Sequence, residues 1–432
     1  MKLNSTTLYE RLSNEEDARA CSGISEEACR EVPGNFLKIL VAQFSTKLAD
    51  SFSSSKVVLP WLLASAGAPA FFAALLVPIR ESGSLIPQLF LGGLVRQFQQ
   101  RKQFYVIGSL LQGSLVALMV ISATQLKGVE LGWAIILLLI FFSFSRGLCS
   151  IANKDVLGKT VPKARRGRLG GLSASLSGIV TLVVTGSMLS FQQPSITFLL
   201  VMLVIASLCW LLAALSFGSI IEYAGATEGA NNGFKVAVRN LNLLRYDKQF
   251  QCFVTVRTLL MGSGLAAPFI VLLATPHTDL AGVLLFVILT GLANLASGLF
   301  WGLLADKSSR YVILLTATLS IGIFLFSALF HILFEPNLSS NSVLAVYLLL
   351  YFLLAVTHQG VRLGRKTYLV DMADGNKRTD YVSVSNTVIG VLLLIYGVVS
   401  GFMAQWNMAA VLVLFSLSSC FALIVAFKLK EV

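Results

Sequence analysis

Charged side chains inside long apolar segments are the residues of this sequence best suited to chemistry. They are five cations and two acids, namely Lys47, Arg80, Arg146, Arg257, Arg362, Asp50 and Glu81. Each costs about 2.5 to 3.5 kcal/mol at the centre of a membrane helix on insertion scales, so it usually faces a cavity or a partner. Because arginine binds carboxylates and phosphates through paired hydrogen bonds, the surplus of cations predicts a cavity for a small anionic solute.

The first apolar segment carries a polar stripe. Gln43, Lys47, Asp50 and Ser54 follow one another at intervals of four, three and four residues, which places them on one face of a helix. We expect Lys47 and Asp50 to meet, either as a structural ion pair or as a switch. In the switch, protonation of Asp50 releases Lys47 and shifts the balance between two conformations. Gln43 and Lys47 are then candidate solute ligands, and Lys56, nearer the outer face, is expected at the membrane interface.

Arg80 and Glu81 stand in the middle of the second apolar segment. Consecutive residues of a helix point about 100° apart, so both charges cannot face one cavity squarely. We expect one of them to pair with Lys47 or Asp50 of the first segment. Asp50 or Glu81 would carry or gate a coupling proton, with Arg80 in the same group, and His358 is a second titratable candidate.

The remaining deep cations lie on the fourth, seventh and tenth segments. Arg362 shares a helix face with His358, four residues before it, and with Tyr351. We expect these three side chains, with Arg146 and Arg257, to bind the solute. Arg257 lies near one edge of its segment, so an alternative is that it reaches the lipid headgroups.

A second role is open for two of these arginines. Arg146 precedes Asp155 by nine residues, and Arg362 precedes Asp371 by nine. Each arginine could therefore pair with its own acid in a gate network instead of binding the solute. The repeated spacing also indicates that the two halves of the chain are related.

The elements that position these charges are predicted membrane helices. Only 12% of the 432 residues are charged and 56% are hydrophobic, with a mean hydropathy of +0.79. These values exclude a soluble globular protein and a protein with one anchor helix. Twelve apolar segments are long enough to span a bilayer: 35–63, 69–95, 103–123, 131–156, 168–190, 195–216, 249–274, 281–304, 310–333, 343–366, 382–403 and 408–428.

Lysine and arginine are strongly biased to one side of these segments. Nineteen lie in five connections on one side, and only Lys127 lies in the six loops on the other. Basic residues of short loops stay in the cytoplasm, so both termini are predicted to be cytoplasmic. Residues 1–34 would form an acidic cytoplasmic extension, 35–216 a six-helix bundle, 217–248 a cytoplasmic linker and 249–432 a second six-helix bundle.

Other functions lack a signature. The sequence has no GxxxxGK[ST] phosphate loop and no pattern of nucleophile, base and orienting group, so we expect neither an enzyme nor ATP-driven transport. The six cysteines are scattered, which predicts free thiols, no metal site and no cofactor. His277 and His331 are expected to be solvated. The net charge of +12 reflects the lysines and arginines on one side of the apolar segments, so no nucleic-acid partner is expected. The short loops favour a bacterial inner membrane.

The junction after the eighth segment resembles a known loop. GLLADKSSR, from Gly302 to Arg310, is similar to the Gly-x-x-x-Asp-Arg/Lys-x-x-Arg loop of the major facilitator superfamily. Gly302 permits close approach of helices, while Asp306, followed by Lys307, can pair with a base or cap a helix. The corresponding loop of the first half has Arg96 where the family usually has an acid.

The resemblance implies an all-α protein of twelve transmembrane helices in two six-helix bundles. It implies a monomeric secondary transporter that alternates access and is coupled to protons or works by exchange. In such a body the first, fourth, seventh and tenth helices line the central cavity, and the loop motif, with Asp155 and Asp371, forms a cytoplasmic gate. The fifth segment lacks the proline common in drug:proton antiporters. An exporter of drugs or amphiphiles, a lipid flippase and a receptor that does not transport remain alternatives.

Overall fold

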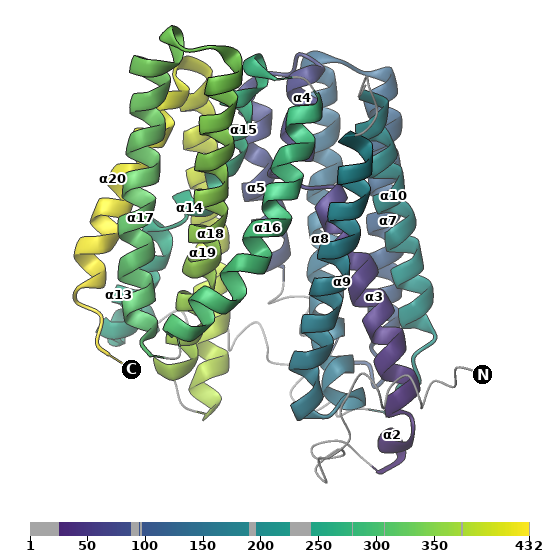
Figure 1. The fold of residues 1–432 in the computed structure, drawn as a ribbon. Helices are drawn as coiled ribbons and strands as arrows, with labels where there is room; N and C mark the ends of the chain where they lie inside the picture. The colour runs from purple at the N-terminus through teal and green to yellow at the C-terminus, as the bar shows by residue number, and fades with distance from the viewer. Residues whose placement is uncertain are drawn as a thin grey trace.

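The computed structural model describes residues 26–87, 95, 97–189, 196–224, 243–278, 280–305, 307–372 and 375–431. All regular secondary structure within these ranges is helical (Figure 1). The long helices are α3 (Val32–Phe52), α5 (Ala70–Leu85), α7 (Lys102–Gln125), α8 (Gly128–Thr160), α9 (Lys163–Leu189), α10 (Ile196–Gly218), α16 (Leu280–Ala305), α17 (Ser309–Leu329), α18 (Ser340–Met372), α19 (Gly375–Trp406) and α20 (Met408–Ala426). The short ones are α2 (Glu26–Arg30), α4 (Val58–Ser65), α12 (Leu243–Tyr246), α13 (Lys248–Leu259), α14 (Gly262–Leu265), α15 (Ala267–Ala274), η2 (Thr275–His277), η3 (Phe330–Phe334) and η4 (Glu335–Asn337).

Each of the twelve predicted apolar segments coincides with a helix or with a broken helix. Within the described ranges, nine helices are long and apolar enough to cross a membrane. The chain is therefore a multi-pass membrane protein. The count of twelve crossings, the cytoplasmic placement of the termini and the boundaries of the two bundles stay predictions.

The first apolar segment is broken near its centre, where five residues separate α3 from α4. Ser53 Oγ donates to Ala49 O at 2.8 Å, and Ser54 Oγ accepts from Lys56 N at 3.3 Å. Serine side chains that bond to nearby backbone groups compete with the helical hydrogen-bond ladder. The break leaves the carbonyl of Ser53 able to accept a hydrogen bond from another helix.

The seventh apolar segment is broken twice, into α13, α14 and α15. Pro268 stands in the first turn of α15, where a missing N–H is tolerated. Gly264 in α14 permits a close approach, because a Cβ there would lie 2.9 Å from His358 Cε1. Both broken segments therefore bring backbone and polar groups together at the centre of the protein.

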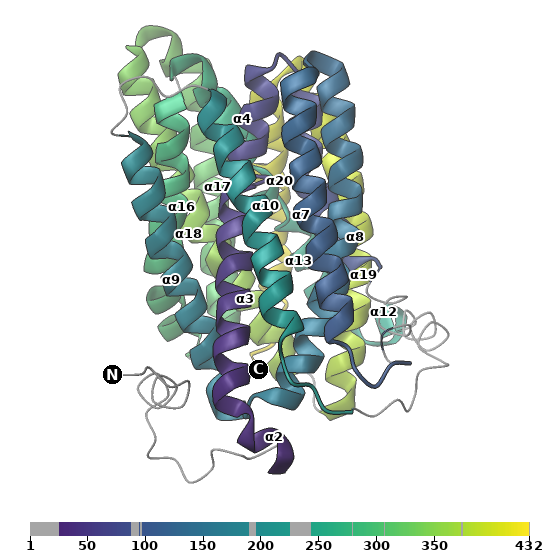
Figure 2. The same cartoon turned by 90° about the vertical axis from the view of Figure 1, so that its right-hand side faces the viewer.

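The helices form two halves. In one half α3, α5, α7, α8, α9 and α10 pack together, and in the other α13 to α20 pack together (Figures 1 and 2). The halves meet where α5 packs against α19 and α9 against α16. Helix α2 and the carboxyl end of the chain lie at the same end of the molecule (Figure 1).

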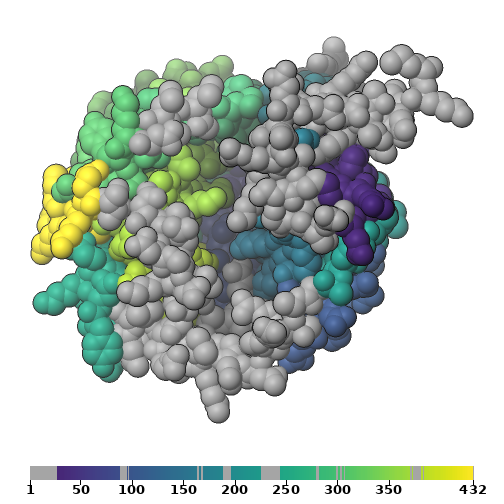
Figure 3. All heavy atoms as spheres, turned by 90° about the horizontal axis from the view of Figure 1, so that it is seen from below, coloured from purple at the N-terminus to yellow at the C-terminus, as the bar shows by residue number. Residues whose placement is uncertain are grey.

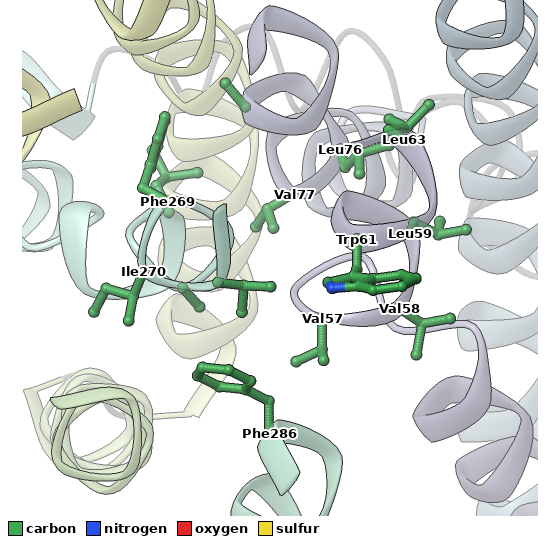
Figure 4. Close-up of a cluster of buried hydrophobic side chains, with 14 of the residues drawn as sticks. Val57, Val58, Leu59, Trp61, Leu63, Leu76, Val77, Phe269, Ile270 and Phe286 are labelled. Carbon is green, nitrogen blue, oxygen red and sulfur yellow. The ribbon is translucent and has the colours of Figure 1, made fainter. Parts of the chain in front are cut away.

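The end opposite the termini is closed by apolar packing between the halves. Val57 and Trp61, at the start of α4, belong to the same buried cluster as Phe269 of α15 and Phe286 of α16 (Figure 4). Viewed from the end with the termini, the molecule is hollowed between the halves (Figure 3). The structure is thus closed at one end and open at the other.

The close contact between α5 and α19 depends on glycine. A Cβ at Gly397 would lie 2.5 Å from Pro78 Cβ and closer still to its Cγ. One turn further, Gly401 faces Phe71, whose ring lies 5.1 Å from that of Phe402. Side chains larger than glycine on this face of α19 would hold the two halves apart.

Cys29 corrects one prediction from the sequence, since it is disulfide-bonded and not a free thiol. A disulfide requires two sulfur atoms at bonding distance, and scattered spacing carries no signal for that. The other described cysteines, Cys149, Cys209, Cys252 and Cys420, are free as expected.

Candidate functional site

Asp50 is the centre of a triad of charges in the first half. Its Oδ1 accepts hydrogen bonds from Arg80 of α5 and from Arg146 of α8, each at 2.5 Å. Arg80 also donates to Ser53 O at 2.9 Å, and its guanidinium lies 5.4 Å from the centre of the Phe142 ring. Arg80 is buried, whereas the side chain of Arg146 is 34% exposed. Arg146 therefore presents the accessible side of the triad.

Two pairings were predicted for the charges of the first two segments, and the structure contains one of them. Arg80 does pair with Asp50, as the helical angle between Arg80 and Glu81 suggested. The predicted Lys47–Asp50 pair is wrong: Lys47 Nζ donates to Gly170 O and to Ser173 Oγ, each at 2.7 Å. The reason is lateral packing, because α9 offers acceptors to Lys47 while two arginines already occupy Asp50.

Gln43 lies beside Lys47 on the same face. Ser173 Oγ donates to Gln43 Oε1 at 3.4 Å, so Ser173 links the two predicted solute ligands. The polar stripe of the first segment is thus divided between two neighbours. Asp50 faces α5 and α8, whereas Gln43 and Lys47 face α9.

Glu81 occupies the space between the two halves. Its side chain is exposed although most of α5 is buried, and no hydrogen bond or ion pair involves its carboxylate within the described ranges. It interacts electrostatically with Lys56, Arg146 and Arg80 of its own half and with Arg362 of the other. The exposure of Glu81 is therefore exposure to the hollow between the halves.

Lys56 is not at the membrane interface, which corrects the prediction. It lies in the break between α3 and α4, and it interacts electrostatically with Glu81, Arg362 and Arg365. The break, which hydropathy does not reveal, turns this residue towards the centre of the protein.

The second half contributes cations with few partners. Arg257 donates to Ser385 Oγ at 2.6 Å and to Asn386 Oδ1 at 3.0 Å, while its Nε has no partner. Arg362 and Arg365 make no hydrogen bond or ion pair with any described residue.

His358 lies between the broken seventh segment and these cations. Its Nδ1 is 3.1 Å from Ser263 Oγ, and it interacts electrostatically with Lys56, Arg362 and Arg365. We define the charge network as Asp50, Glu81, Lys56, Arg80, Arg146, Arg257, Arg362 and Arg365, with six cations and two carboxylates.

Tyr351 does not share the position of His358. It is 2% exposed, its hydroxyl lies 2.8 Å from Thr290 Oγ1, and its ring contacts Phe286 of α16. The residue thus packs within the second half. Helical spacing predicted a common face correctly, but it did not show that a neighbouring helix covers the outer part of that face.

The two outer histidines are not simply solvated, as the sequence suggested. His277 Nε2 lies 2.8 Å from Glu335 Oε1, and His331 Nδ1 lies 2.6 Å from Glu335 Oε2. Tyr347 also donates to Glu335. The helix α17 continues into η3 and η4, and this extension carries Glu335 back to both imidazoles.

Asp155 pairs with Arg101 and, at 2.7 Å, with Lys159, so the proposed pair with Arg146 is wrong. Nine residues of helix rise about 13.5 Å, which is too far for Arg146 to reach. The buried carboxylate of Glu222 accepts from the first backbone N–H groups of α7 and from Lys159 at 3.1 Å. This cluster joins α7, α8 and the end of α10 near the termini.

The rest of the predicted gate lies partly outside the described residues, namely Asp306, Arg96 and the side chain of Asp371. Gly302 lies within α16, and Lys307 is exposed in the turn that follows. Arg310 donates to Phe427 O at 3.0 Å and lies 3.6 Å from Glu431, so it links α17 to the end of the chain.

A cavity of about 280 Å³ in the first half contains residues that the sequence analysis missed. Gln112, Asn153 and Trp210 line it together with the predicted Gln43, Lys47 and Arg146. An amide near the middle of the third apolar segment was the available signal for Gln112.

No protein-family model matches the chain, and no curated protein matches it either. Solved structures do match. A mutant of the nucleoside transporter NupG superposes with a TM-score of 0.70 at 14% identity, covering 91% of this chain and 99% of that one. A D-xylose-proton symporter gives 0.65 at 13% identity, with 91% and 97% covered.

The xylose transporter XylE from E. coli, in a partially occluded inward-open conformation, gives a TM-score of 0.63 at 14% identity, with 91% of this chain and 99% of that one covered. These proteins are membrane transporters and not enzymes. At this level of identity the likeness extends to the whole arrangement of helices and defines the fold. The chain has the fold of the major facilitator superfamily of membrane transporters.

Proposed function

We propose that this protein is a secondary transporter that carries a small anionic solute, such as a carboxylate or a phosphate ester, by alternating access. The observation that supports this is the charge network, which has six cations and only two carboxylates. Fixed positive charge in a medium of low dielectric needs a counter-ion, and a bound anion supplies one.

The solute would contact the cations that protein groups do not neutralise. Arg362 and Arg365 have no partner among the described residues, and Arg257 is held by neutral groups only. Arg146 shares Asp50 with Arg80 and keeps an exposed side. Arginine side chains from both halves can therefore close on one anion, which favours a conformation with the halves together around it.

Glu81 is the proposed proton carrier. Asp50 is fixed by two arginines at 2.5 Å, whereas Glu81 is exposed and without a hydrogen-bond partner within the described ranges. Protonation of Glu81 would raise the net positive charge beside Arg362 and strengthen binding of an anion, so proton and solute would travel together. Asp50 would then act on the gate through Arg146 and not as the carrier.

A neutral, hydroxyl-rich solute is the second candidate. The similar structures are transporters of nucleosides and xylose, and Arg257 is itself bound by a hydroxyl and an amide, which are neutral groups. In this case the arginines would serve mainly as partners for Asp50 and Glu81.

Flux into liposomes distinguishes these candidates. The purified protein is reconstituted, and uptake of radiolabelled succinate, phosphate, xylose and uridine is measured with and without an inward proton gradient. We expect uptake of an anion, its loss in Arg362→Ala, and normal uptake in Lys366→Ala, which removes an exposed cation one turn away on the same helix. Uptake of xylose or uridine that Arg362→Ala leaves unchanged would refute the anion proposal.

The same assay tests the coupling residue. Glu81→Gln should exchange labelled for unlabelled solute at a normal rate but lose accumulation driven by the proton gradient. Accumulation that persists in Glu81→Gln would reject Glu81 as the carrier. The inner membrane of a bacterium is the proposed location, and a monomer is the proposed functional unit.

A further inference from the structure

The cavity of the first half lies inside one bundle and not between the halves. It is lined by residues of α3, α7, α8 and α10, which pack together in this half (Figures 1 and 2). Its volume of about 280 Å³ is near the lower limit for small-molecule sites. The space fits a small metabolite or the polar part of a larger one.

Three residues that line the cavity each carry a buried polar atom without a hydrogen-bond partner within the described residues. The atoms are Gln112 Oε1, Asn153 Oδ1 and Trp210 Nε1. Gln112 and Trp210 are fully buried, on α7 and α10 respectively. Buried polar groups in proteins are almost always paired, so three in one cavity indicate a place where something polar binds.

The direction of these groups follows from their chemistry. Gln112 Nε2 donates to Gly108 O at 3.2 Å, which fixes the amide so that Oε1 is the free acceptor. Trp210 Nε1 can only donate. Asn153 carries both a donor and an acceptor. The cavity thus offers complementary hydrogen-bonding groups, as a hydroxyl or an amide of a ligand requires.

The two cations that line the cavity are among its partly exposed residues. Lys47 and Arg146 line it, and both are partly exposed, in contrast to Gln112 and Trp210. Arg146 also belongs to the charge network, so the cavity and the proposed solute site share this residue. An anion held at Arg146 would have its uncharged part beside the cavity that Gln112 and Trp210 also line.

We propose that this cavity is a specificity subsite that binds the hydroxyl-bearing part of the transported anion, so that the substrate class is a small hydroxylated carboxylate or phosphate ester. This inference rests on the proposed function, since Arg146 must hold the anionic group. The orphan donor and acceptor, and not the cations, would select among anions of equal charge.

The test measures thermal stabilisation of the purified full chain by pairs of anions at constant pH and ionic strength, because a ligand that binds the folded state raises its stability. One pair is succinate and malate, which differ by one hydroxyl, and the other is inorganic phosphate and glycerol 3-phosphate. In the wild type the hydroxylated member of at least one pair should have the lower apparent Kd. Trp210→Phe and Gln112→Leu should each raise that Kd about fivefold to tenfold, the usual effect of one hydrogen bond, and leave the Kd of the other member unchanged.

Trp61→Phe is the matched control. The indole Nε1 of Trp61 is also buried and has no hydrogen-bond partner in the described part of the chain, but Trp61 belongs to the apolar cluster of Figure 4 and does not line this cavity. This variant should keep the full preference for the hydroxylated anion. If Trp210→Phe fails to fold, Asn153→Ala, at a less buried position, provides the same comparison.

Two outcomes overturn the inference in different ways. Equal affinity for both members of each pair, with binding that Arg362→Ala abolishes, would refute the subsite and leave the proposed function intact. Absence of stabilisation by all four anions would refute the proposed function and the subsite with it. A hydroxyl preference that survives both cavity variants would place the selective groups elsewhere.

Discussion

The closed end of the molecule should open when α19 gains one methyl group at Gly397. In the structure a Cβ at this position would lie 2.5 Å from Pro78 Cβ and closer to its Cγ. A proline ring is fixed to its own backbone and cannot rotate away. Gly397→Ala therefore forces α5 and α19 apart instead of causing a local adjustment of side chains.

The size of the effect follows from the cost of overpacking. Inserting a methyl group into a packed interface costs typically about 1 to 3 kcal/mol. The cost falls only on the conformation in which α5 and α19 touch, so the ratio of open to closed molecules should rise about 5-fold to 150-fold. Because the unstrained conformation remains available, the protein should fold and insert normally.

Thiol labelling measures this shift. Ala74 of α5 is 3% exposed and faces Gly401 of α19, so Ala74→Cys reports on opening in a background without the native free thiols. In detergent, Gly397→Ala should raise the rate of maleimide labelling at position 74 by a factor within the range above. Gly322→Ala is the control, because a Cβ at Gly322 meets nothing within 4 Å. Equal labelling rates in the two variants would refute the argument.

Three further predictions concern polar groups inside the protein. Asp50→Asn leaves Arg80 and Arg146 without their counter-charge. The side chains of Asp50 and Arg146 are 25% and 34% exposed, so solvent screens part of the loss and the cost should stay below the about 3 to 5 kcal/mol of a fully buried pair. The melting temperature should still fall, and an unchanged melting curve would contradict the triad. Glu222→Gln removes the negative charge of a side chain that caps α7. The free energy of unfolding, measured by chemical denaturation, should fall by about 1 to 2 kcal/mol. Because the group is buried, a higher salt concentration should reduce this difference only slightly. Tyr351→Phe removes the hydrogen bond to Thr290 and should lower the free energy of unfolding by about 1 kcal/mol. The Kd of the transported solute should not change. A higher Kd would show that Tyr351 contacts the solute.

Hydropathy and charge patterning predicted the helical segments well, because each segment must bury its backbone in a bilayer and its length is set by bilayer thickness. Two adjacent charges on one helix must point in different directions, so it was predictable that one of Arg80 and Glu81 would pair with the first segment, but not that Arg80 would pair with Asp50. The breaks within the first and seventh segments could not be predicted. They arise from serines and glycines whose effect depends on the neighbouring helices, and the first break moved Lys56 to the centre.

The sequence could not show which residues of different helices would be partners. Lys47 and Asp50 lie on one face, but the sixth of a turn between them decides whether α9 or α5 is the neighbour. Arg146 and Asp155 repeat the spacing of Arg362 and Asp371, yet Arg146 pairs with Asp50, and Asp155 pairs with Arg101 and Lys159. Buried amides such as Gln112 carry little signal until the cavity beside them is known.

The surplus of cations in the charge network has an electrical consequence. A membrane potential of 100 mV acts on each elementary charge that crosses it with about 2.3 kcal/mol. If the network moves relative to the field when the two halves rock, the unloaded carrier transports positive charge in its return step, and a bound anion cancels part of it. Membrane voltage would then act mainly on the empty protein, and the turnover rate in liposomes should depend on an imposed potassium diffusion potential most steeply when the solute is scarce.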